Sequence, residues 1–496
     1  MAVPFRALLL VIFWAPIAAS AADARPEPSD LEQSLRRVAD VYRLLEKHSY
    51  KSFDPEAAFY GGALPGMVGS LDPFSAFLDP DQFESLQEMQ RSTEKGFGSV
   101  LSVNHGRVVV LQTLPDSPSA RSGMAPGDEI VVVNGYALAN LSIDQLIALL
   151  SQTRQHEAEL LVKRPNSTRL LPLKLTPAEM ADPSVQGQFF IEPGVAYMKV
   201  ANFESGTDAE LRDSIEQLGG ADLEGLVLDF HGNPGGVVEA AVRTAAMFLE
   251  PRDRILWIQG REGPREEVRV PQGVEPYRFP LAVLIDDRTA SAAELVVGAL
   301  QDHDRARVIG SRSFGKGLVQ SVFPLAESSG LALTTARYLS PSGRPIQREL
   351  DECHEYQLAS CDEGPAETYK TDEGREIPGG GGIAPDQTVY PRAYSSFEGF
   401  LMGVDAFLKF AQEYVNQHHD IDEDFEVSSA LLDEFQLYLS ERKVRPTLAE
   451  WTSSVEFIRA RLQQEILSLG VSVESGDRVE RRHDPQVLAA LRSLGN

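Results

Sequence analysis

One serine and one lysine carry the most visible chemistry in this sequence. Ser291 opens an apolar helical run, and Lys316 stands between Gly315 and Gly317. A serine hydroxyl becomes a nucleophile at neutral pH when a base takes its proton. A lysine amine can act as that base if burial destabilises the ammonium form. The segment Asp286–Gln320 is therefore interpreted as a Ser/Lys hydrolase site, which the rest of the chain would have to position.

The position of Ser291 allows two readings. A serine at the start of a helix is commonly an N-cap. A nucleophile at a strand-to-helix junction gains more, because the helix N-terminus stabilises developing negative charge and the next backbone N–H can enter an oxyanion hole. On this reading the N–H donor belongs to Ala292.

The alternative base would be a histidine. His303 lies twelve residues after Ser291 on the same helix, which is about 18 Å away at 1.5 Å per residue. His231, in an Asn-Pro-Gly-Gly loop, stays possible, although no acid partner is specified by spacing. Lys316 and Gln320 would share one face of an extended segment, so the Gln320 amide could hold the lysine amine. A solvated loop lysine is the alternative.

A phosphate-binding loop is the nearest rival for the lysine. Residues 310–317 read G-x-x-x-x-G-K-G, whereas the nucleotide-binding pattern requires Ser or Thr at the last position and a helix after it. Here Gly317 precedes an alternating, strand-like run. Nucleotide binding is therefore disfavoured.

A second glycine-rich loop could complete an oxyanion hole. The apolar run after Leu226 ends in His-Gly-Asn-Pro-Gly-Gly, so the backbone N–H groups of Gly235 and Gly236 are unobstructed by side chains. An ordinary turn is the alternative, because Asn-Pro and Gly-Gly both mark loops.

Composition limits the class of protein and its partners. The chain has 496 residues, a net charge of −27 and a pI near 4.8. Length alone predicts about three domains, and the acidity disfavours nucleic acid and anionic membranes as partners. No cofactor, nucleotide or metal is implied, since the one histidine near the cysteines leaves too few zinc ligands.

The N-terminus indicates export. Arg6 precedes the apolar run Ala7–Ala19, and Ala19-Ser20-Ala21 fits a small-x-small cleavage site, so residues 1–21 are predicted to be a signal peptide. An uncleaved anchor is the alternative. In an oxidising compartment the two cysteines, Cys353 and Cys361, are expected to form one local disulfide. We expect an extracytoplasmic location, most simply a bacterial periplasm, with no membrane span after cleavage.

The order of elements predicts an α+β multidomain protein. Residues 31–48 have helical apolar spacing, and short alternating strands begin near Lys95. Strands alternate with helices after residue 188, and helical stripes follow residue 397. The expected divisions are 1–21, signal peptide; 22–90, helical arm; 91–177, strand-rich domain; 178–392, hydrolase core, with a cysteine-containing insertion at 348–380; and 393–496, C-terminal helical region. The two helical ends could also mediate homodimer formation.

The strand-rich domain resembles a PDZ domain. Its motifs are the run Gly123–Ile130, the Asn134-Gly135 hairpin turn and the helical run after Leu141. The resemblance places the carboxylate-binding loop at Lys95, Gly96, Phe97 and Gly98. The strand 99–103 would then pair with a peptide by β-augmentation. A PDZ domain that only packs against its neighbours is the alternative.

Together the motifs resemble those of carboxyl-terminal processing proteases, Ser/Lys peptidases with an embedded PDZ domain. The similar segments are SLDPFSAFLDP, GMAPGDEIVVVNG, VLDFHGNPGG, TASAAEL, GSRSFGKGLVQ, YLSPSGRPIQ and GGGGIAPD. The resemblance assigns the nucleophile to Ser291, the base to Lys316 and the supporting glutamine to Gln320. It assigns the oxyanion donors to Ala292 and a glycine of the 233–236 loop. It also implies a core of stacked β-β-α units similar to crotonase and Clp protease.

Two positions depart from the family pattern. His231 replaces an arginine before the Asn-Pro-Gly-Gly loop, and Phe74 replaces a histidine. The expected function is still a serine endopeptidase that cleaves extracytoplasmic proteins near their C-termini, with the PDZ domain capturing an apolar C-terminal tail. The alternative is a catalytically silent relative that only holds such tails as a scaffold.

Overall fold

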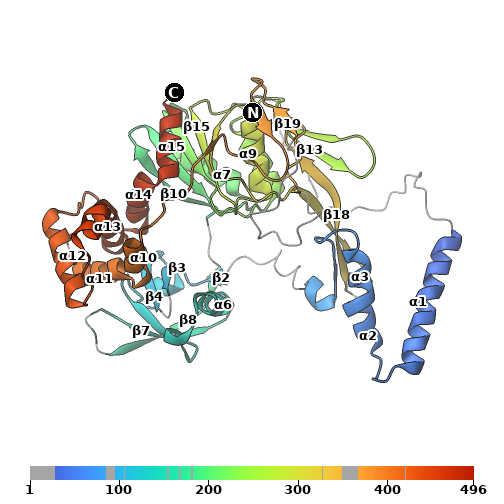
Figure 1. Ribbon diagram of the computed structural model, residues 1–496, viewed down its shortest axis with the longest axis horizontal. Coiled ribbons are helices and arrows are strands. Elements are labelled where there is room, and N and C mark those ends of the chain that lie inside the picture. The colour runs from blue at the N-terminus through green and yellow to red at the C-terminus, as the bar shows by residue number, and fades with distance from the viewer. Residues whose placement is uncertain are drawn as a thin grey trace. The chain divides into compact units, whose positions relative to one another are not determined.

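The computed structural model describes residues 28–84, 95–104, 107–153, 156–165, 167, 169–179, 183–326, 328–348, 367–418 and 420–495. The chain divides into two compact units. The first contains residues 1–92, 258–265 and 318–338, and the second contains residues 93–257, 266–317 and 339–496. Figure 1 labels their helices and strands. Among the described residues, none of the helices combines the length and apolar character that a bilayer span requires.

The first unit joins N-terminal helices to a small antiparallel sheet. Its elements are α1 (Pro28–His48), α2 (Pro55–Ala58), the π-helical turn η1 (Phe59–Ala63), α3 (Leu64–Gly69), β1 (Ala76–Leu78), β17 (Leu318–Pro324) and β18 (Gly330–Leu339, whose last residue belongs to the second unit). β1 and β17 both pair antiparallel with β18. The Asp72 side chain shapes the turn before β1 by accepting the N–H groups of Phe74 and Ser75, each at 2.8 Å.

Helix α1 confirms the helical spacing predicted for residues 31–48. Its apolar side chains recur every three or four positions, as a buried stripe would require. All of them are nevertheless exposed in this chain: Leu31, Leu35, Val38, Val41, Leu44 and Leu45. The apolar face of α1 is therefore not covered by the described residues of the chain.

The strand-rich part of the second unit is an antiparallel sheet with two helices. Its elements are β2 (Lys95–Gly96), β3 (Ser99–Asn104), β4 (Arg107–Thr113), α5 (Pro118–Arg121), β5 (Glu129–Val133), β6 (Tyr136–Ala137), η2 (Leu138–Asn140), α6 (Ile143–Thr153), β7 (Ala158–Lys163), β8 (Leu170–Leu175) and β9 (Ala178–Glu179). The strand order is β3-β4-β5-β7-β8, with β6 beside β5. Asn134 and Gly135 have φ of 48° and 83°, which fits the hairpin turn predicted there.

A six-stranded sheet forms the centre of the second unit. Its order is β10-β11-β12-β15-β16-β21, and every pair except β10 with β11 is parallel. The strands are β10 (Val185–Glu192), β11 (Val195–Val200), β12 (Gly225–Asp229), β15 (Leu281–Ile285), β16 (Arg307–Gly310) and β21 (Gln387–Thr388). β12 and β15 are buried at every residue. Their continuous apolar runs are typical of parallel strands covered on both faces.

Helices cover this sheet and connect its strands. The connecting elements are α7 (Thr207–Gln217), η3 (Gly220–Asp222), α8 (Val238–Ala246), β13 (Arg254–Gly260), β14 (Glu266–Arg269) and α9 (Ala292–Asp302). Helix α9 is buried along its whole length and packs against α8. The last helix of the chain, α15 (Pro485–Leu494), contacts β12, β15 and β16. Val487, Ala489 and Ala490 of α15 share an apolar cluster with the sheet.

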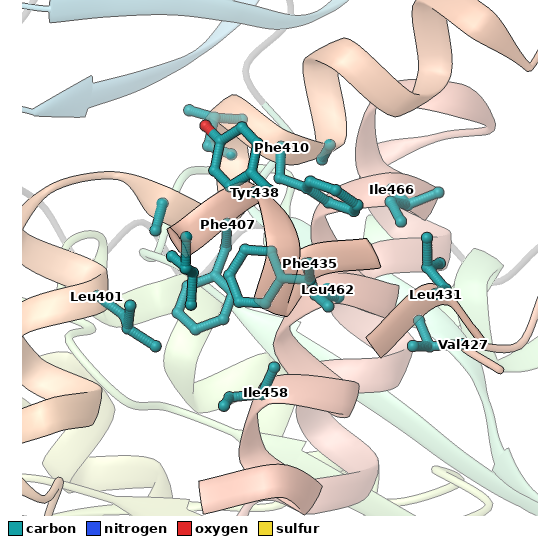
Figure 2. Close-up of a cluster of buried hydrophobic side chains, with 14 of the residues drawn as sticks. Leu401, Phe407, Phe410, Val427, Leu431, Phe435, Tyr438, Ile458, Leu462 and Ile466 are labelled. Atoms are coloured by element: carbon teal, nitrogen blue, oxygen red, sulfur yellow. The ribbon is translucent and has the colours of Figure 1, made fainter. Parts of the chain in front are cut away.

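The other C-terminal helices have their own apolar core, shown in Figure 2. They are α10 (Ser396–Gly403), α11 (Ala406–Gln417), α12 (Ser429–Glu441), α13 (Leu448–Gly470) and α14 (Val473–His483). A capping box of Thr447 and Glu450 starts α13. Phe407, Phe410 and Phe435 interlock in this core, and each such ring contributes about 1.5–3 kcal/mol by burial.

Candidate active site

Ser291, Lys316 and the 233–236 loop lie at one edge of the central sheet. Three loops leave the carboxyl ends of the parallel strands β12, β15 and β16, and they span residues 230–237, 286–291 and 311–317. Ligand sites of open α/β sheets form outside the carboxyl ends of the strands. Ser291 lies at the end of the second loop, and Lys316 lies in the third.

Hydrogen bonds tie the three loops together. The Thr289 hydroxyl donates to Phe230 O at 2.9 Å, and Ala290 N donates to Asn233 O at 2.9 Å. Phe314 N in turn donates to Thr289 O at 2.9 Å. The middle loop is therefore bonded to both of its neighbours.

Ser291 adopts a backbone conformation that few residues with side chains adopt. Its φ is 54° and its ψ is −119°, so the position carries strain of order 1–3 kcal/mol. α9 begins at the next residue. The turn places a partly buried serine at the positive end of the helix dipole.

Glu294 connects the serine to the lysine loop, and our sequence analysis did not identify it. Its carboxylate is fully buried and accepts four hydrogen bonds. Oε2 accepts the backbone N–H groups of Ser291 and Lys316, each at 2.8 Å. Oε1 accepts Gly315 N at 2.7 Å and the Ser313 hydroxyl at 2.5 Å. One carboxylate oxygen therefore binds the main chain of both candidate reactive residues.

Burial raises the pKa of Glu294, and its four hydrogen bonds only partly oppose that effect. Among the described residues, no cationic side-chain group donates a hydrogen bond to this carboxylate. A signal for this residue was present in the sequence, since Ser291 and Glu294 have the S-x-x-E spacing of a capping box.

Close packing around Lys316 explains its two glycine neighbours. A Cβ on Gly315 would lie 3.0 Å from Arg348 Cβ, and a Cβ on Gly317 would lie 2.6 Å from Gln347 N. The Gln347 side chain also accepts Gly317 N at 3.0 Å, and Arg348 N donates to Gly315 O at 3.0 Å. The Lys316 backbone is thus held on both sides. The hydrogen bonds of the described residues include none between its Nζ and Ser291 Oγ.

The 233–236 loop contacts the serine directly. A Cβ on Gly235 would lie 2.8 Å from Ser291 Cβ and 2.9 Å from Ala292 N, so only glycine allows this approach. Gly235 N donates to Asn233 Oδ1 at 2.8 Å. In the described part of the chain, no hydrogen bond uses the N–H groups of Ala292 and Gly236, which leaves both able to donate to a ligand.

His231 lies two residues before this loop and is paired with the buried Asp229. Its Nδ1 lies 2.9 Å from Asp229 Oδ1, and the same oxygen accepts His231 N at 2.8 Å. Asp229 Oδ2 also accepts the Tyr197 hydroxyl. Burial would lower the pKa of His231, but the charge and hydrogen bond of Asp229 raise it overall. The sequence analysis identified no acid partner for His231, although Asp229 lies only two residues before it, at the end of the preceding strand.

The other histidine considered as a base lies at the far end of α9. His303 is the C-cap residue of this helix, as its distance along the sequence requires. Its Nδ1 lies 2.6 Å from Asp372 Oδ2, and its Nε2 lies 2.7 Å from Arg254 O. The nucleotide-loop alternative also fails on structure, since β17 rather than a helix follows Gly317.

The remaining site predictions have different outcomes. Gln320 lies on β17 in the first unit, where its amide donates to Phe74 O at 2.9 Å. Cys353 and Cys361 lie outside the described residues, as does the segment 1–21. Lys95 and Gly96 form β2, which pairs with β9. Gly98, at a φ of 69°, leads into β3, an edge strand of its sheet.

Comparison with known proteins identifies the family. Residues 194–352 match the sequence profile of Peptidase family S41, and residues 109–164 match that of the PDZ domain. A carboxyl-terminal-processing protease of Synechocystis is 31% identical over 298 residues, which are 58% of this chain and 68% of that protein. The chain belongs to the carboxyl-terminal processing protease family. It is accordingly a serine-type peptidase, a hydrolase.

Two further matches have lower sequence identity. A carboxy-terminal processing protease of Bacillus subtilis is 25% identical over 65% of this chain and 67% of its own length. The chain thus spans about two thirds of both curated relatives. A solved photosystem II D1 C-terminal processing protease is 27% identical and covers 73% of this chain and 88% of its own. Its TM-score is 0.42, too low to establish the fold.

Proposed function

We propose that this member of the family is an endopeptidase in which Ser291 is the nucleophile and Lys316 the general base. The observation that carries the proposal is the Glu294 carboxylate, one oxygen of which accepts the N–H groups of both residues at 2.8 Å. A group that holds nucleophile and base in one frame reduces the entropy lost in reaching the transition state.

The proposed reaction proceeds through an acyl-enzyme. Neutral Lys316 takes the Ser291 hydroxyl proton while Oγ bonds to the substrate carbonyl carbon. The oxyanion accepts the N–H groups of Ala292 and of a glycine in the 233–236 loop. The lysine ammonium then gives its proton to the leaving amine as the C–N bond breaks. Water, deprotonated by Lys316, hydrolyses the ester and frees Ser291.

Gly236 is the better of the two glycine donors in this scheme. The N–H of Gly235 is already bound to Asn233 Oδ1, so using it would require that bond to break. Gln320 is proposed to support the lysine amine in the competent enzyme. For that role its amide must exchange the bond to Phe74 O for one to Lys316.

The PDZ domain is proposed to capture the substrate tail. β3 is an edge strand and can accept a peptide strand by β-augmentation. The preceding loop offers its backbone to a terminal carboxylate, since no hydrogen bond among the described residues uses the N–H groups of Phe97 and Gly98. Phe97 and Leu101 pack against the domain core beside this strand, which suits an apolar tail.

Location, domain plan and assembly complete the proposal. The apolar run Ala7–Ala19 favours export and extracytoplasmic substrates. We retain the predicted domain divisions and the β-β-α description of the core. The exposed apolar face of α1 supports a homodimer. Sedimentation of the Leu35→Glu protein should then show monomers under conditions in which the parent chain is dimeric.

Cleavage of unfolded β-casein, followed by mass spectrometry of the new termini, tests the proposed function. Ser291→Ala and Lys316→Ala should each lower kcat/KM by about 1,000-fold or more. Ser205→Ala and Lys370→Ala, both at exposed positions, are matched controls expected to behave like the parent chain. If highly purified parent protein binds the substrate without cutting it, the scaffold alternative is correct. Unchanged cleavage by Ser291→Ala would overturn the proposed nucleophile.

A further inference from the structure

The buried pair of His231 and Asp229 supports an inference that rests on the proposed function and extends it. His231 stands between the end of β12 and the loop that touches Ser291. Its side chain is 16% exposed, and that of Asp229 is 1% exposed. Both the ring and the backbone of His231 are bonded to the same carboxylate oxygen. These two bonds fix the chain at His231, two residues before the 233–236 loop begins.

The two ring nitrogens of His231 differ in their surroundings. Nδ1 is bonded to Asp229, whereas Nε2 is buried and has no hydrogen-bond partner among the described residues. When the imidazolium loses a proton, Nε2 is the nitrogen that loses it, because Nδ1–H remains bonded to a carboxylate. The number of hydrogen bonds then stays the same. What changes is that the fully buried Asp229 anion faces a neutral ring.

The charged groups around the pair come from four elements. Tyr197 of β11 donates to Asp229, and Asp286, after β15, adds negative potential at His231. Arg481 of α14 lies 5.8 Å from the centre of the Tyr197 ring and favours the Asp229 anion. Asp484, between α14 and α15, adds negative potential at His231. The negative charges of Asp229, Asp286 and Asp484 favour a protonated histidine.

The interaction between Asp229 and His231 lowers the pKa of the aspartate and raises the pKa of the histidine. Burial would raise the pKa of Asp229, but the charge of His231 and the hydrogen bonds from His231 and Tyr197 lower it well below its usual range. The pKa of His231 is raised above the ordinary 6.5 despite burial. The ion pair therefore exists at low and neutral pH, and it is lost as pH rises through the raised pKa of His231.

The loop transmits any change at His231 to the site. The next residue, Gly232, donates its N–H to Asp286 Oδ1 at 2.9 Å, and Asn233 Nδ2 donates to Val200 O at 2.8 Å. Gly235 then packs against Ser291 Cβ with no room for even one methyl group. A shift of the loop would thus move the N–H of Gly236 relative to the serine.

We propose that His231 is a positioning residue whose protonated ring, paired with Asp229, holds the 233–236 loop in its oxyanion-binding geometry. Peptide hydrolysis then has an alkaline limit set by His231. An arginine at position 231 would keep its charge at every accessible pH.

The test is the pH dependence of kcat/KM for fluorescently labelled β-casein. In the parent chain, activity should fall on the alkaline side. In His231→Arg the alkaline limb should disappear. In His231→Gln, which lacks the charge at all pH values, activity should be about tenfold lower, with no alkaline limb of its own. His303→Gln is the matched control, because His303 is also a partly buried histidine paired with an aspartate. It should retain the parent profile.

The inference is overturned if His231→Arg and His231→Gln both keep the parent alkaline limb. If a variant does not fold, NMR titration of labelled histidines in the parent chain provides a second measurement. The His231 signal is assigned by its absence from the spectrum of His231→Gln or, if that variant does not fold, by sequential assignment. Its midpoint should coincide with the alkaline limb, and a clear difference would also overturn the inference. Failure of the proposed function is distinguishable, since it would appear as unchanged cleavage by Ser291→Ala.

Discussion

The two ends of α9 each stabilise a buried carboxylate, but they do so with different partners. Each end holds a fully buried carboxylate, Glu294 in the first turn and Asp302 in the last. Glu294 accepts hydrogen bonds from three backbone N–H groups and one hydroxyl. Asp302 is instead paired with the buried guanidinium of Arg344 at 2.9 Å.

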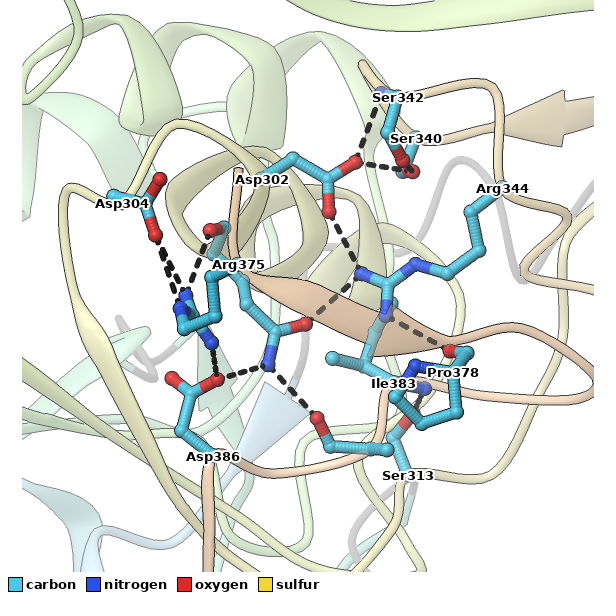
Figure 3. A network of polar contacts seen from close by, with 12 residues as sticks. Asp302, Asp304, Ser313, Ser340, Ser342, Arg344, Arg375, Pro378, Ile383 and Asp386 are labelled. Carbon is cyan, nitrogen blue, oxygen red and sulfur yellow. Dashed lines mark hydrogen bonds and ion pairs between the residues drawn. The ribbon is translucent and has the colours of Figure 1, made fainter. Parts of the chain in front are cut away.

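Figure 3 shows how far the ionic arrangement at the C-terminal end extends. Arg344 also donates to Gln301 Oε1 at 2.9 Å, and Asp302 accepts the hydroxyl of Ser340. Nearby, Arg375 is paired with both Asp304 and Asp386. These contacts fasten the residues before and after the segment 349–366 to the end of the helix.

The helix dipole explains the difference. A carboxylate is favourable in the first turn, where backbone N–H groups are unpaired, and unfavourable in the last turn, where a cation must compensate. The N-terminal end can thus bind an anion without a fixed cation. Lys316 contributes its backbone N–H, not its amine, to the hydrogen bonds of Glu294, which suits its proposed role as a base. The C-terminal end serves stability.

The largest expected effect is at the ionic end. Arg344→Met leaves Asp302 buried without its cation and should lower the free energy of unfolding by about 3–5 kcal/mol. Chemical denaturation measures this loss. Adding Asp302→Asn should restore a large part of it, because the uncompensated charge disappears. Equal stability of the parent and Arg344→Met proteins would show that the pair is not required.

The next effect is at the other end and concerns activity. Glu294→Gln replaces one acceptor oxygen by an amide that faces N–H donors, so the Ser291 and Lys316 loops should lose their common anchor. We expect kcat/KM for labelled casein to fall about 100-fold, or about 2.7 kcal/mol. Asp302→Asn is the matched control and should cost stability without a comparable loss of activity. Similar kinetics for both variants would remove the functional distinction between the two ends.

The smallest expected effects come from removing one serine hydroxyl at each end of α9. Ser313 donates to Glu294 and Ser340 donates to Asp302. Each change to alanine should cost about 1.5–3 kcal/mol of stability, as expected for a hydrogen bond to a charged group. Only Ser313→Ala should also reduce kcat/KM, by about tenfold. Thermal unfolding and casein cleavage, measured on the same samples, separate the two outcomes.

The sequence predicted the strands of the central sheet well, because buried parallel strands have continuous apolar sequences. The apolar run near Leu226 corresponds to β12, and the alternation of strands and helices expected after residue 188 includes β15. It also predicted α9 and the strand after Gly317. These features depend on local periodicity, which a single sequence displays.

Features that depend on distant partners were less accessible. Glu294 lies in an apolar helix and gains its role from Gly315 and Lys316, which no periodicity connects to it. The same holds for the Phe74 carbonyl that binds Gln320, and for α15, whose apolar face covers the central sheet at the other end of the chain. Tertiary contacts between segments far apart in sequence decide all three.

The most direct test of the central claim is covalent labelling with a fluorophosphonate probe, followed by peptide mass mapping. A serine reacts with this probe when a base activates it. The account predicts one adduct, on Ser291, in the parent chain and its loss in Lys316→Met, with labelling retained in Lys370→Met. An adduct on another serine, or equal labelling of Ser291 in Lys316→Met, would contradict it.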